Sequence, residues 1–151
     1  MIYISYIGIG YMVLLFLPNI IWTKFKPQNY DSSHEARLLV ILERVGEILT
    51  TFFAIVSFRQ TTYQIDILFV LSVLCILLYE GYWLYYFKSD HQLSDFYCSF
   101  CRIPLAGATL PIMAFVFLSL CQHNWLLLTA TFLLGIGHIG IHYQHFCELH
   151  K

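Results

Sequence analysis

Five apolar stretches of about 20 residues each, separated by short polar segments, run along the chain. A helix of roughly 20 mostly apolar residues is long enough to cross a bilayer. The pattern therefore predicts five transmembrane helices, at about 2–23, 37–58, 66–87, 103–122 and 125–146. The last two are separated by little more than CQHNW, which is short enough to make them an antiparallel hairpin. The expected fold class is all-α, a polytopic membrane helical bundle.

Composition agrees with a membrane protein and argues against two other classes. Hydrophobic residues make up 59% of the chain and charged residues 11%, whereas soluble proteins average about 45–50% and about 25%. With 151 residues and no long hydrophilic segment, residues 1–151 are expected to form a single transmembrane domain. A net charge of -1 and the lack of a Lys/Arg run argue against nucleic acid as a partner.

The basic residues between the predicted helices indicate the orientation in the membrane. One side carries Lys24, Lys26, Arg37, Lys88, Arg102 and Lys151, and the other side carries Arg59. Because Lys and Arg are enriched in cytoplasmic loops, we expect a multi-pass protein of the cell membrane with its N-terminus outside and its C-terminus in the cytoplasm. The aromatic run YEGYWLYYF at 79–87 is expected to form a belt at the cytoplasmic interface.

Ionisable residues inside the predicted helices gather in the cytoplasmic half of the membrane. At a rise of about 1.5 Å per residue, Glu43, Glu80 and His138 all lie roughly 9 to 12 Å from the inner ends of their helices. Charged side chains within a membrane usually pair or face a cavity. We therefore predict one site, formed by the second, third and fifth helices. Its expected members are Glu43, Arg44, Glu47, Glu80, His138 and His142.

The segment GIGHIGIHYQHF, residues 135–146, supplies the histidines of this site. At 100° per residue, His138, His142 and His145 fall within an arc of about 60° and so share one face of the fifth helix. His142 and His138 are predicted within the membrane, and His145 reaches the interface, where a histidine needs no special explanation. The glycines between them, like Ala106, Gly107 and Ala108 on the fourth helix, permit close approach of neighbouring helices.

A purely structural network is the alternative to a functional site. Arg44 and Glu47 are three residues apart on one helix and can pair with each other. Glu43 or Glu80 then remains to accept a hydrogen bond from a histidine. This alternative explains the charges, but it does not explain why they gather in one half of the membrane on three separate helices.

Three kinds of function suit such a site. The favoured one is handling of an ion or small solute, as a minimal transporter or a transporter subunit, because histidine titrates near neutral pH and intramembrane carboxylates mark ion paths. The second is a membrane-embedded enzyme acting on a lipid or lipid-linked substrate, with a divalent metal on His138 and His142 as the candidate cofactor. The third is an accessory subunit that binds another membrane protein. The expected partners are membrane lipid and either a second copy of the chain or another membrane subunit.

A C-x-x-C pair is a separate candidate. Cys98 and Cys101 lie in the segment DFYCSFCRIP, and such a pair can be a redox couple or half of a zinc site. The predicted orientation places both thiols on the reducing cytoplasmic side, and no second C-x-x-C completes a four-thiolate site. Thiol redox chemistry is therefore the lesser hypothesis.

Three short segments resemble parts of a known group of proteins. ERVGE at 43–47, IPLAGATLP at 103–111 and GIGHI at 135–139 are similar to segments of a family of small, uncharacterised multi-span bacterial membrane proteins. The resemblance covers the second, fourth and fifth predicted helices. It implies a compact helical membrane bundle, and it implies no particular activity, substrate or catalytic residue.

Overall fold

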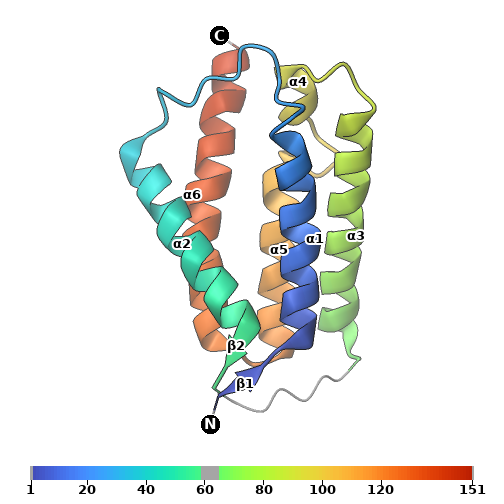
Figure 1. Cartoon of the computed structure of the whole chain (residues 1–151), viewed down its shortest axis with the longest axis vertical. Coiled ribbons are helices and arrows are strands. Elements are labelled where there is room, and N and C mark those ends of the chain that lie inside the picture. The colour runs from blue at the N-terminus through green and yellow to red at the C-terminus, as the bar shows by residue number, and fades with distance from the viewer. Residues whose placement is uncertain (1, 59–64, 151) are drawn as a thin grey trace.

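The computed structural model describes residues 2–58 and 65–150. Within these residues the chain forms six helices and one pair of short strands. In chain order the elements are β1 (Tyr3–Ile4), α1 (Tyr6–Trp22), α2 (Arg37–Ile55), β2 (Val56–Ser57), α3 (Ile67–Phe87), α4 (Leu93–Phe96), α5 (Ala106–Cys121) and α6 (Trp125–Leu149). The five long helices run along the long axis of the molecule (Figure 1). We refer to the end that carries β1 and β2 as the strand end and to the end that carries α4 as the α4 end.

The all-α class is confirmed, whereas only two of the five predicted transmembrane helices have the length and composition expected of a membrane-crossing helix in the described part of the chain. Of the described helices, α3 with 21 residues and α6 with 25 are long and apolar enough to cross a membrane. The apolar helices α1 and α5 have only 17 and 16 residues, and α2 carries Glu43, Arg44 and Glu47 in its 19 residues. The length and composition of α3 and α6 fit a membrane-associated protein.

Local structure at the helix ends accounts for the shorter helices. The Ser5 hydroxyl accepts a hydrogen bond from the Gly8 N–H and so starts α1 four residues later than the apolar pattern suggests. At the other end of the predicted second helix, residues 56–57 pair with residues 3–4 as antiparallel strands. On the fourth helix, Leu105 has a left-handed backbone with φ of 47°, so α5 begins at Ala106.

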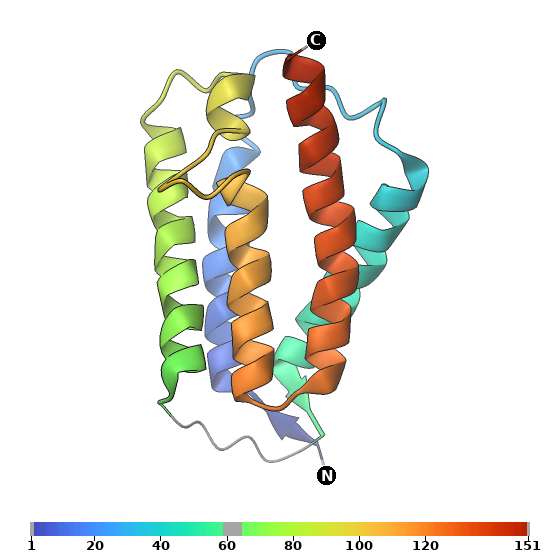
Figure 2. The ribbon, with the colours of Figure 1, turned by 180° about the vertical axis from the view of Figure 1, so that it is seen from behind.

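Two helix pairs make up most of the bundle, α2 with α6 and α3 with α5, and α5 also packs against α6. Figure 2 shows α5 and α6 side by side, with α2 crossing behind α6. Glycines allow the α2–α6 crossing, because a Cβ at Gly46 would overlap the backbone of Leu134 and one at Gly137 would overlap the backbone of Glu43. The predicted close packing of the α6 glycines is therefore confirmed at Gly137.

The aromatic run at 79–87 forms a core rather than a belt. Tyr79, Tyr82, Trp83 and Tyr86 are buried against α4 and the start of α5. The Tyr82 hydroxyl donates to the Phe96 carbonyl at 2.6 Å, and this contact fixes α4 on top of α3. Burial of the rings follows from the loop of residues 88–105, which folds back over the end of α3 and covers it (Figure 2).

Candidate functional site

Glu43 of α2 and His138 of α6 form the closest contact between ionisable side chains of different helices in the described part of the chain. The Glu43 Oε1 atom lies 2.6 Å from His138 Nδ1. The contact exists because Gly137 lets the α2 backbone approach α6 at the level of Glu43. Both side chains are largely shielded, with exposed fractions of 19% and 28%. A carboxylate and an imidazole at this distance share a hydrogen bond whose proton either group can hold.

His142 continues the line of imidazoles toward the α4 end. Its ring centroid lies 4.6 Å from that of His138. The ring is buried between Phe96 and Tyr97, whose centroids lie 5.5 and 5.3 Å away. Its Nδ1 atom has no hydrogen-bond partner among the described residues. His142 is therefore a polar side chain inside an aromatic environment, one helical turn from the Glu43–His138 contact.

His145 completes the line, and its buried side chain has partners that the sequence did not predict. Its side chain is 8% exposed, and its Nε2 atom lies 3.1 Å from Glu35 Oε1. The ring stacks on Tyr97 at 5.4 Å, and Nδ1 lies 3.5 Å from Glu148 Oε2. The side chain is buried because α6 continues to Leu149 and the segment before α2 folds over it.

Glu35, Tyr97 and Tyr30 are site residues that sequence reasoning missed. Burial and, to a lesser extent, Glu35 raise the pKa of Tyr30 to about 12. Burial and then Tyr30 and Glu35 raise the pKa of Tyr97, so both phenols remain protonated at neutral pH. One signal for Glu35 was present in the sequence, since it stands two residues before the predicted second helix, whose start was expected on the same side as His145.

The imidazole–carboxylate line is the name we give to five residues that follow one another along α6, namely Glu43, His138, His142, His145 and Glu35. It runs along one face of α6, over the seven residues from His138 to His145. That separation corresponds to about 10 Å along the helix axis. The structure thus brings together three of the six residues predicted from the sequence, namely Glu43, His138 and His142.

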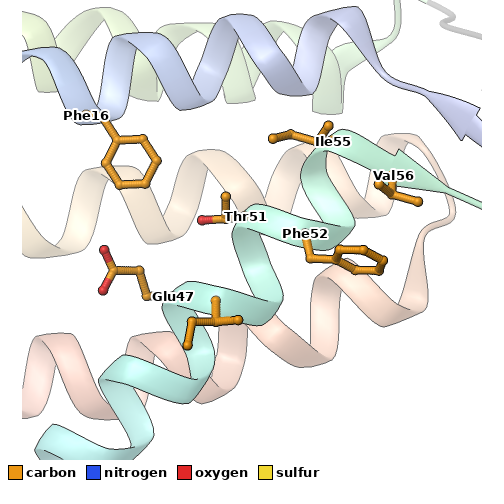
Figure 3. Close-up of a pocket in the computed structure, with 7 residues that line it drawn as sticks. Phe16, Glu47, Thr51, Phe52, Ile55 and Val56 are labelled. Atoms are coloured by element: carbon orange, nitrogen blue, oxygen red, sulfur yellow. The ribbon is translucent and has the colours of Figure 1, made fainter.

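Arg44 and Glu47 lie apart from this line. Arg44 Nη1 is 3.3 Å from Glu47 Oε2, the intrahelical pairing that the structural alternative expected. The two side chains are 70% and 40% exposed. They stand at one end of a groove of about 450 Å³ between α1 and α2, which Glu47 lines together with Phe16, Ile48, Thr51, Phe52, Ile55 and Val56 (Figure 3).

Glu80 belongs to another helix interface. It lies on α3, which packs against α5 and α1 rather than against α2 or α6. One of its carboxylate oxygens is buried and has no hydrogen-bond partner among the described residues. The three helices of the predicted site therefore do not contribute equally, because only α2 and α6 supply side chains that contact each other.

The structure adds no support to the metal-site hypothesis or to the thiol redox hypothesis. Within residues 2–58 and 65–150, no group of three or more His, Cys, Asp and Glu side chains has an arrangement that could hold a metal ion. Cys98 and Cys101 are free thiols. Burial and then Asp95 raise the pKa of the Cys98 thiol, which lowers its thiolate fraction, whereas redox-active cysteines have depressed pKa values.

Comparison of the chain with protein-family models, with curated proteins and with solved structures finds no match. The resemblance to small bacterial membrane proteins therefore stays a prediction, and the site has to be interpreted from its own geometry.

Proposed function

We propose that all five long helices cross a membrane as one multi-pass bundle. The support is that each of these helices carries large apolar side chains that are exposed on the outside of the bundle. Contiguous exposed apolar surface usually marks a membrane or protein interface. Examples, one per helix, are Ile20, Ile48, Leu77, Met113 and Ile136. The 16 residues of α5 correspond to about 24 Å, a mismatch that local thinning of the bilayer accommodates.

The orientation follows from the basic residues of the described chain. Lys24, Lys26, Arg37 and Lys88 all lie in or beside the segments of the α4 end (Figure 1). Arg59 and Lys151, which also entered the sequence-based count, lie outside the described residues. With the α4 end in the cytoplasm, the N-terminus is outside the cell and the C-terminus is inside.

We infer that the protein handles an ion, and that the ion is a proton which moves along the imidazole–carboxylate line. The observation that carries this proposal is the 2.6 Å contact between Glu43 and His138, next to the His142 ring. The His145–Glu35 pair lies further along the same face of α6. Chains of carboxylates and imidazoles inside membranes mark proton relays. An imidazole suits this role because it can accept a proton at one nitrogen and donate from the other.

A proton fits this arrangement better than a metal cation does. Calcium and similar ions need six or more oxygen ligands around one point. The described side chains form a line instead, with each group close to one or two neighbours. The enzyme and the accessory-subunit hypotheses remain predictions, since no particular contact favours either.

Proton flux into liposomes tests the proposal directly. Purified protein reconstituted with an internal pH-sensitive dye should acidify or alkalise the lumen when a potassium diffusion potential is imposed. Glu43→Gln should abolish this flux, because the amide cannot hold the proton that His138 exchanges. Glu80→Gln is the matched control, since it changes an intramembrane carboxylate of another interface, and it should retain the flux.

Two results contradict the proposal. One is wild-type flux no larger than that of empty liposomes, and the other is unchanged flux in Glu43→Gln. Loss of flux in Glu80→Gln with full flux in Glu43→Gln would move the path to α3.

A further inference from the structure

The Arg44–Glu47 pair occupies an unusual position for a membrane helix. Glu43 turns toward α6, whereas Arg44 is rotated about 100° from it and is 70% exposed. In the bundle proposed above, this pair lies near the middle of α2 and faces outward. Charged side chains inside a membrane almost always face a protein interior or a cavity, because contact with lipid tails is costly. The pair therefore needs a covering surface that one copy of the chain does not supply.

The surface around the pair has the pattern of a helix–helix contact. Ile41, Arg44, Ile48, Thr51 and Ile55 follow one another at alternating spacings of three and four residues. This spacing is typical of the seam between two packed helices. Beside the seam, the groove between α1 and α2 offers a recess (Figure 3). The exposed side chains of Ile48 and Phe52 are among those that line it.

We propose that this face of α2 binds the same face of a second copy of the chain, related by a two-fold axis parallel to the bundle. The proposal rests on the membrane crossing proposed above. Two-fold symmetry requires a surface that complements itself, and a neighbouring Arg and Glu meet this requirement. Arg44 of one copy would reach Glu47 of the partner, and the partner's Arg44 would reach Glu47 of the first copy. The exposed side chains of Ile48 and Phe52 of each copy would pack into the groove of the other.

A second copy fits this surface better than a lipid headgroup does. Arg44 and Glu47 neutralise each other, so together they present no net charge to an anionic headgroup. They also lie about 10 to 15 Å from the start of α2, away from the depth at which headgroups are found. The groove and the Arg44–Glu47 pair on this face are therefore complementary to the same face of a second copy.

Photocrosslinking from within the membrane tests the interface. A benzophenone amino acid at Ile48, which is 68% exposed, should give a crosslinked band of two chains, each of 17.7 kDa. The matched control is the same amino acid at Leu77 of α3, which is 62% exposed and equally apolar. It should crosslink to lipid alone. A band of any other mass at Ile48, or no protein band, overturns the second copy as the partner.

Charge exchange separates an intermolecular role from pairing within one helix. Arg44→Glu gives a face with two acidic groups and Glu47→Arg gives one with two basic groups, so each variant alone should lose the dimer band by about tenfold or more through like-charge repulsion. Co-expression of the two variants with different tags should restore a mixed dimer. No recovery on mixing, with both variants present in the membrane, contradicts the interface.

The outcome is independent of the flux experiment. Wild-type flux without a dimer band removes the interface and leaves the proton proposal standing. A dimer band without flux removes the proton proposal and leaves the interface standing.

Discussion

Gln144 of α6 holds the backbone on both sides of Glu35: its side-chain amide donates to the His34 carbonyl at 2.7 Å and accepts from the Ala36 N–H at 3.1 Å. These two bonds fasten the segment before α2 to α6 and bring Glu35 against His145. The Glu35 end of the imidazole–carboxylate line is therefore positioned by a neutral side chain that takes no part in it.

Gln144→Leu should loosen this segment without unfolding the bundle. A hydrogen bond contributes about 1 kcal/mol, so exchange of the Ala36 amide with deuterium should accelerate about fivefold. Hydrogen exchange followed by mass spectrometry on peptides covering residues 30–40 measures the change. Tyr143→Leu, at an exposed neighbouring position, is the control and should leave the exchange rate unaltered.

Gly137→Val should separate α2 from α6, because even a Cβ at this position would overlap the backbone of Glu43. Overpacking of this kind costs about 2 kcal/mol, so the thermal midpoint in detergent should fall by several degrees. Gly10→Val is the control, since a Cβ at Gly10 meets no atom within 4 Å. Equal midpoints for the two variants would show that the backbone contact is not tight.

His142→Phe and His138→Phe should differ in stability. His142 is surrounded by Phe96 and Tyr97 and has a buried Nδ1 without a partner, so a phenyl ring should fit with a change of less than about 1 kcal/mol. His138→Phe leaves the shielded Glu43 carboxylate without its partner and should cost about 2 kcal/mol or more. Urea or heat unfolding followed by tryptophan fluorescence compares them. A larger loss in His142→Phe would contradict this difference.

Flux in His142→Phe separates structure from function. If protons pass through the line, this variant should fold normally and yet transport at the level of empty liposomes. Normal flux would show that the path bypasses His142 and would restrict the relay to the two carboxylate–histidine pairs.

Cys98 should react with iodoacetamide more slowly than Cys101 at pH 8. The raised pKa of the Cys98 thiol, caused by burial and then by Asp95, keeps less of it as the reactive thiolate below that pKa. Cys101 is exposed. The Cys98 rate should therefore rise with pH through its raised pKa, and Asp95→Asn should increase it at pH 8. Peptide mass spectrometry of timed samples distinguishes the two thiols, and faster labelling of Cys98 would contradict its burial.

Helical periodicity could predict which residues share a face, but it could not predict which helix that face meets. The common face of His138, His142 and His145 followed from their spacing. The choice of Glu43 over Glu80 as the partner of His138 depends on α6 packing against α2 rather than α3. Gly46 on α2 and Gly137 on α6 allow these two helices to pack closely. A single sequence does not reveal the point at which two helices cross, so this packing could not be predicted.

Hydropathy located each long helix, but it overestimated the length of those whose ends are set by local hydrogen bonds. The third predicted helix at 66–87 differs from α3 by one residue, because Asp66 caps α3 and also bounds the apolar run. At the start of α1 the apolar run continues through Tyr3 and Ile4 into a strand. Apolar residues occur in both helices and strands, so hydropathy alone does not distinguish a helix from a strand.

The contact between Gly46 and Leu134 has a mechanical consequence. The α2 backbone meets α6 at this point, while Gln144 restrains the Ala36 side of α2 and the β1–β2 pair restrains its other end. With the contact at Gly137, this is a second point at which the two backbones meet, so α2 and α6 are expected to move together as one unit. A displacement of the segment that carries Glu35 is therefore expected to be transmitted through this helix pair to the strands at the strand end.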